Sequence, residues 1–259
     1  MCKGGIPMKL IKVLVIFLGI LLLCVGCSQD LLNRLLQQDS EAEIDHETLG
    51  ILLAHICYDS VDQVFEQTVD AEGFSWETNA NNQPFTINRT IENGNIQETG
   101  SGAYSFNPTS KTLTASITNF KITFLGDIAI KDENDKPIGS VKKGGAITVS
   151  NYTLQAQFAP NPYEPGKFFP SNIIISSYPI SGSFNIDFID SAYKDGTLKF
   201  ENFKLNNVTI TLSDPKSVPQ VTVNGWDGKI TFEGEEVTKS VVDEFKWILP
   251  EVIERESEN

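Results

Sequence analysis

The chain has 259 residues, with 34 acidic and 20 basic side chains and a formal net charge of −14 at pH 7. Such an acidic chain repels phosphate backbones and anionic lipid headgroups, which argues against nucleic acid as a partner and against membrane attachment through a basic patch. The length suffices for one domain with a substantial core, and we expect no second domain.

The beginning of the chain has the pattern of an export signal. Lys9 and Lys12 lead into the apolar run from Val13 to Leu23, and small residues follow it. The run is too short to span a bilayer comfortably, so a cleaved signal peptide over residues 1–26 fits better than a permanent transmembrane helix. Met8 opens a more typical signal than Met1, which leaves two possible starts.

The end of this signal, Val25-Gly26-Cys27, resembles the lipobox of bacterial lipoproteins. In that family a peptidase cuts before the cysteine, and the thiol carries a diacylglyceryl group. The resemblance implies lipidation at Cys27 and an anchored protein of the cell envelope. Modification of Cys24 instead would place the bulky Leu23 before the cut. Ser28, rather than an aspartate, follows Cys27, which in Gram-negative lipoproteins points to the outer membrane, with the domain on its periplasmic or surface side.

Two amphipathic helices are expected, one at each end of the domain. Apolar residues spaced by three and four predict a helix over 45–69, after a lipidated N-terminus and tether over 27–43. The same spacing predicts a helix over 237–249, which Pro250 limits unless it begins another short turn.

Residues 73–234 have the composition of strands and turns, and the connections are expected to be antiparallel hairpins. Three segments share the form apolar, polar, Asn, aromatic, polar, apolar: Ile117–Ile122, Val149–Leu154 and Phe200–Leu205. The central Asn interrupts the alternation, so each strand should bulge or bend there. We therefore predict one mainly β domain over 44–259, an antiparallel meander that forms a curled sheet, half-barrel or sandwich with helices at both ends.

Few residues suggest chemistry. His46 and His55 are too far apart on the first helix to share a metal ion. His55, Asp59, Asp62 and Glu66 fall on one helical face, which a solvated polar surface explains. Cys57 lies in the apolar pattern of that helix and should be a small buried residue with no disulfide partner. Because no catalytic arrangement is present, we expect no enzyme, no metal and no cofactor.

Four aromatic residues are candidates for contact with a partner. Tyr163, Phe168 and Phe169 lie in the proline-rich stretch 158–170, which we expect to form a stiff loop outside the sheet interior. Trp226 lies between Asn-Gly and Asp-Gly, at an expected hairpin tip. Rigid aromatics on loops are typical binding anchors. The alternative is that they fold back over the open end of the core or pack against a neighbouring loop.

Two functions compete. The first is a membrane-anchored envelope lipoprotein that acts as a binding or structural module for a protein or glycan. The second is a carrier or chaperone for a hydrophobic ligand or lipid in a half-barrel groove, similar to the carriers that move lipoproteins between bacterial membranes. If the helices fill the concave face of the sheet, the first is favoured; a cavity of several hundred cubic ångströms would favour the second.

Overall fold

The computed structural model describes residues 42–131 and 136–258. The predicted signal peptide, Cys27 and nearly all of the predicted tether lie outside the described residues. From Ile44 onward the chain forms one compact unit.

This unit begins and ends with a helix, and strands lie between. The helices are α2 (His46–Glu66) and α3 (Thr238–Glu258), and a short 3₁₀ helix, η1 (Glu92–Gly94), follows the first strand. The first five strands are β1 (Ala80–Ile91), β2 (Ile96–Asn107), β3 (Thr112–Phe124), β4 (Ile128–Lys131) and β5 (Pro137–Val141). The other five are β6 (Ala146–Pro160), β7 (Phe168–Phe188), β8 (Gly196–Thr211), β9 (Gln220–Phe232) and β10 (Glu235–Glu236).

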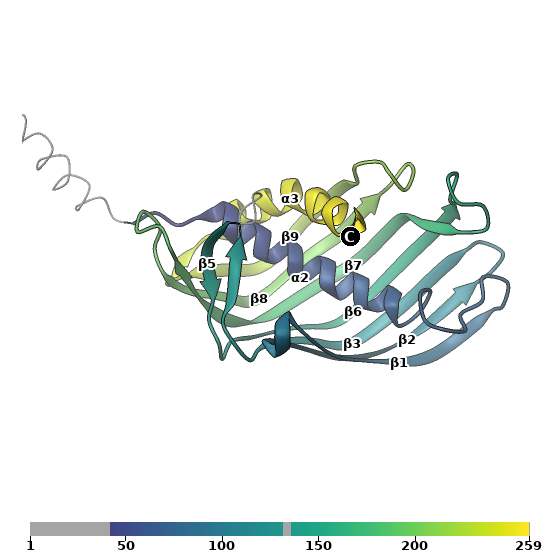
Figure 1. Cartoon of the computed structure of the whole chain (residues 1–259), viewed down its shortest axis with the longest axis horizontal. Coiled ribbons are helices and arrows are strands. Elements are labelled where there is room, and N and C mark those ends of the chain that lie inside the picture. Colours follow the sequence, from purple (N-terminus) through teal and green to yellow (C-terminus); the bar gives the residue numbers. More distant parts are fainter. Residues whose placement is uncertain (1–41, 132–135, 259) are drawn as a thin grey trace, which may run out of the picture. The chain divides into compact units, whose positions relative to one another are not determined.

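The strands form a single antiparallel sheet in the order β1-β2-β3-β6-β7-β8-β9-β10. The β4–β5 hairpin leaves this path, and β5 pairs with the end of β7 through Gly139 and Phe188. This edge of β7 is available because β6 begins only at Ala146, opposite Ser183. Figure 1 shows the sheet curled around α2 and α3, which lie across its concave side. The predicted mainly β fold, with a curled antiparallel sheet and a helix toward each end, is confirmed.

The repeated segments contain the predicted irregularities, at the central asparagine in two copies and beside it in the first, where the β2–β3 register shifts between Ser101 and Gly102. All nine apolar side chains of the repeats are buried: Ile117, Phe120, Ile122, Val149, Tyr152, Leu154, Phe200, Phe203 and Leu205. Asn151 and Asn202 have φ angles of 53° and 50°, in the left-handed region that asparagine tolerates. The β8–β9 register shifts between Glu201 and Lys204, around Asn202. These irregularities allow apolar residues on both sides of each bend to face the helices.

Some element ends differ from the prediction. Residues 67–79 form turns, so the strands begin at Ala80 and not near Gly73. Helix α3 continues through Pro250 to Glu258, so the prediction that the helix ends at this proline was wrong. The proline removes the backbone hydrogen bond to the residue four positions earlier, and its ring crowds the carbonyl group there, which destabilises the helix. Leu249 and Val252, on either side of it, are both buried, and their packing favours a continuous helix.

A buried polar network fixes α2 to the middle of the sheet. The Tyr178 hydroxyl donates to the Ile56 carbonyl oxygen at 3.0 Å and lies 2.6 Å from Ser60 Oγ. The Tyr152 hydroxyl donates to the Ser60 carbonyl oxygen at 3.1 Å. Burial raises the pKa of Tyr178 well above its ordinary value, so the phenol stays protonated and continues to donate. One helix is thus tied to both β6 and β7.

The helices supply a large part of the core. The apolar side chains of α2 and α3 that are at most 6% exposed are Leu49, Leu53, Ala54, Ile56, Cys57, Val61, Val64, Val241, Val242, Phe245, Leu249 and Val252. The two helices approach closely at Gly50, where an added Cβ would lie 2.5 Å from Glu244 Cβ. As predicted, Cys57 is a buried free cysteine, and burial raises the pKa of its thiol to about 12. The apolar stripes of both helices are therefore packed into the domain core.

Candidate functional site

The turns after β2, β6 and β8 lie together at one end of the sheet, which we call the distal end (Figure 1). Thr112, Gln157, Asn172 and Thr211 form one cross-strand row there. Helix α2 ends on the same side, where the centroids of the Phe65 and Phe158 rings are 5.8 Å apart. The helix begins at the opposite end of the sheet, so the chain enters the domain far from these turns.

A polar pocket of about 390 Å³ opens at the distal end, between the start of β1 and the outer side of β2, β3 and β6. Its amide side chains are those of Asn79, Asn81, Asn107 and Gln155. Its hydroxyl side chains are those of Ser105, Ser110, Thr112 and Thr114. Ala80 and Phe106 complete the lining, so no acidic or basic residue contributes to it. We call this the polar pocket.

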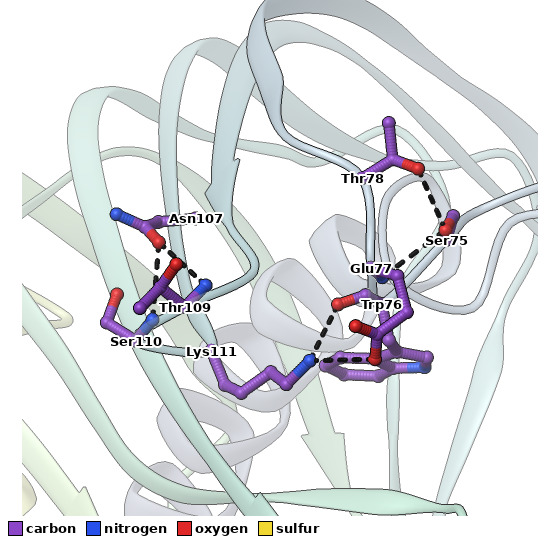
Figure 2. Close-up of polar contacts among 8 residues, drawn as sticks. All are labelled: Ser75, Trp76, Glu77, Thr78, Asn107, Thr109, Ser110 and Lys111. Carbon is purple, nitrogen blue, oxygen red and sulfur yellow. Dashed lines mark hydrogen bonds and ion pairs between the residues drawn. The ribbon is translucent and has the colours of Figure 1, made fainter.

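The turn between β2 and β3 gives the pocket one fixed wall. Asn107 Oδ1 accepts hydrogen bonds from the backbone N–H of Thr109 at 2.9 Å and of Ser110 at 3.2 Å (Figure 2). Such side-chain-to-backbone bonds are why asparagine is favoured in turns. Since the oxygen of the amide is held by the turn, its Nδ2 group is the part that remains to donate.

Lys111 ties this turn to the segment before β1. Its Nζ donates to the Trp76 carbonyl oxygen at 2.7 Å and lies 3.2 Å from Glu77 Oε1, as Figure 2 shows. The same Nζ lies 5.0 Å from the centroid of the Phe168 ring. Residues 75–78 lead directly into Asn79 and Asn81, the opposite wall of the polar pocket. The lysine therefore holds the two walls in one arrangement.

We call the contacts of Lys111 with Trp76 and Glu77 the Lys111 clamp. Beside it, aromatic rings cover the end of the core. Trp76 stacks on Phe168 at 4.6 Å between centroids and contacts Phe158 edge-on at 5.0 Å. Phe168 is partly buried and Phe169 is only 7% exposed. For Phe168, the structure favours the alternative that it covers the end of the core. Phe169 is buried but does not belong to the hydrophobic core cluster.

The predicted loop over 158–170 is much shorter than expected. Strand β6 runs to Pro160, β7 begins at Phe168, and only residues 161–167 form the turn between them. The prediction of a loop outside the sheet was therefore wrong for residues 158–160 and 168–170, which belong to strands β6 and β7. Pro160 lies in the last pair of the ladder, opposite Phe168, where a proline disturbs the sheet least.

The other two candidates, Tyr163 and Trp226, lie in different surroundings. Tyr163 is 53% exposed at the tip of the β6–β7 turn, and Lys216 Nζ lies 4.4 Å from its ring centroid. Trp226 is partly buried in the interior of β9, opposite Leu205, so its predicted place at a hairpin tip was wrong. Gly225 and Gly228, with φ angles of 143° and 72°, flank it within a strand. Of the four candidates, Tyr163 is the one that the structure leaves widely exposed.

A group of charged side chains includes Glu66, the last residue of α2, and none of its members lines the polar pocket. The Arg89 Nε donates to Glu98 Oε2 at 2.5 Å, and Arg89 Nη1 lies 3.5 Å from Glu66 Oε1. Glu98 is fully buried. Burial raises the pKa of the nearby Asp70 carboxyl, and the negative charge of Glu66 raises it further.

Across residues 42–131 and 136–258, no three His, Cys, Asp or Glu side chains are grouped so that they could hold a metal ion. Neither α2 nor α3, nor any other helix within these ranges, combines the length and hydropathy that a membrane-spanning segment needs.

Sequence reasoning missed the polar pocket and Lys111. The one local signal was the run Asn79 to Gln83, which is rich in amide side chains and contains no charge. No known protein family, curated protein or solved structure matches this chain. The function is accordingly argued from the residues and their geometry.

Proposed function

We propose that the protein is a bacterial envelope lipoprotein, anchored through a lipid on Cys27, that acts as a binding module. The basic, apolar and small-residue pattern of residues 1–26, followed by the lipobox-like Val25-Gly26-Cys27, supports the anchor. Ser28 supports an outer-membrane location. The acidic composition is consistent with attachment by acyl chains and not by basic side chains.

The burial of the apolar stripes of α2 and α3 in the core is the observation that carries the binding role. A carrier for a lipid or other apolar ligand needs an apolar groove of ligand size. The side chains that would line it, among them Leu53, Phe245 and Leu249, are fully buried against the sheet. The polar pocket lies instead at the distal end, in contact with solvent. This arrangement supports a module that works through its surface.

The anchor is tested by replacing Cys27 with alanine in the full chain. Without the thiol no diacylglyceryl group can be attached, so the expected product is an uncleaved, unlipidated precursor. Intact mass measurement and partition into detergent distinguish this product from the processed protein. The effect should be complete, because one thiol carries the whole modification.

Cys24→Ala is the matched control for this experiment, since it removes a cysteine three residues earlier in the same signal. This variant should be cleaved and lipidated normally. Normal processing of Cys27→Ala, or loss of processing in Cys24→Ala alone, would contradict the assignment of Cys27.

A further inference from the structure

We propose that the polar pocket binds an uncharged saccharide. This inference rests on the proposed binding role and names the chemical class of the partner. None of the ten lining residues is titratable under ordinary conditions, although the chain carries a net charge of −14. An anionic ligand would meet the repulsion of the whole domain with no cation in the lining to offset it. A cationic ligand would find no carboxylate there.

The hydrogen-bonding groups of the pocket suit a polyol. Saccharide hydroxyls both donate and accept, and amide and hydroxyl side chains do the same. Four amides and four hydroxyls line a volume of about 390 Å³, which falls in the usual range for small-molecule sites. Such a lining offers many neutral partners and little apolar surface.

Several of these groups are available for a ligand. Thr114 and Gln155 lie opposite each other in the β3–β6 register, with both side chains exposed on the outer face. Neither side chain makes a hydrogen bond to any residue that the structure describes. Asn107 has its Oδ1 held by two backbone N–H groups, which leaves Nδ2 to donate. These three side chains can therefore bind a ligand without giving up bonds within the protein.

The pocket is also organised before any ligand arrives. Thr114 and Gln155 belong to interior strands of the sheet, whose backbone positions are fixed by neighbours on both sides. The Lys111 clamp and the stacking of Trp76 on Phe168 fix the loop walls. A preformed site loses less conformational entropy on binding, and this helps weak neutral hydrogen bonds to give measurable affinity.

The test is calorimetric titration of the full-length protein, as the cell processes it, in a detergent without a sugar headgroup. The probes are three neutral hexasaccharides, built from glucose with α linkages, from glucose with β linkages and from N-acetylglucosamine. Hexagalacturonate serves as the charged comparison. We expect at least one neutral probe to bind and hexagalacturonate to bind at least tenfold more weakly.

Two variants locate the binding in the pocket. Gln155→Ala and Thr114→Val should each lower the affinity for the neutral probe by about fivefold to tenfold, the usual loss for one hydrogen bond. Gln97→Ala is the matched control, because Gln97 lies toward the other end of β2 and does not line the pocket. It should bind as the wild type does. Since Gln155 and Thr114 are exposed, both variants should keep the wild-type midpoint of thermal unfolding.

Three results would overturn the assignment: no neutral probe binds, hexagalacturonate binds as tightly, or affinity is unchanged in Gln155→Ala and Thr114→Val. These failures are separable from a failure of the anchor. A protein that carries lipid on Cys27 but binds none of the three neutral probes would remain an anchored lipoprotein without a saccharide site.

Discussion

Replacing Arg89 with methionine is expected to lower the free energy of unfolding by about 3–5 kcal/mol. The Arg89 Nε is the partner of Glu98 Oε2, and the Glu98 side chain is fully buried. The other carboxylate oxygen, Oε1, already has no hydrogen-bond partner among the described residues. Methionine keeps much of the arginine's apolar length but leaves the buried carboxylate without its cation. Urea unfolding of both proteins measures the difference.

The double variant Arg89→Met with Glu98→Leu separates charge from packing. If the cost comes from an uncompensated buried carboxylate, removing that carboxylate should restore most of the lost stability. Glu98→Leu alone should cost less than Arg89→Met, because the arginine is partly exposed and can turn toward water. A loss below about 1 kcal/mol in Arg89→Met would show that water already solvates Glu98 and would contradict its burial.

Phe245→Ala should likewise lower the free energy of unfolding by about 3–5 kcal/mol, as expected for a buried phenylalanine. Phe245 is 0% exposed on the inner face of α3. The reason is the lost burial plus the cavity left between α3 and the sheet. Thermal or urea unfolding gives the value, and a single cooperative transition would show that the helix unfolds with the sheet.

Trp247→Ala on the same helix is the control for this prediction. Trp247 is 78% exposed, so its removal should change stability by no more than about 0.5 kcal/mol. If Phe245→Ala were as mild, α3 would be a loosely held cover and not part of the core. That outcome would favour the carrier alternative, in which a helix opens to admit an apolar ligand.

The curl of the sheet could be predicted from sequence because its cause is local and repeated. Each of the three apolar patterns with a central asparagine has an irregularity at or beside that residue, and its apolar side chains stay buried, as Phe120, Tyr152 and Phe203 show. The helices were predictable for a similar reason, since their spacing of three and four marks one buried stripe.

Turn signals were less reliable where tertiary packing competes with them. The glycines around Trp226 form an irregularity within β9 and not a hairpin tip, because pairing with β8 continues on both sides of them. Pro250 failed to end α3 because buried neighbours hold the helix on either side. In both places, contacts distant in sequence outweigh a local preference.

The polar pocket could not be predicted at all from sequence. Its lining comes from three separate parts of the chain, residues 79–81, 105–114 and 155, which the pairing of β1, β2, β3 and β6 brings together. Asparagine, serine and threonine on exposed strand positions look like ordinary solvated surface. Only the register of the sheet and the clamp by Lys111 turn them into one site.

The most direct test of a surface-acting module is native mass spectrometry, with lipid extraction, of residues 28–259 expressed without the leader. Because the apolar side chains of α2 and α3 are buried in the core, the expected mass is that of the chain alone, with no apolar molecule in the extract. A lipid or other apolar molecule that copurifies in stoichiometric amount would contradict this packing and would make the protein a carrier.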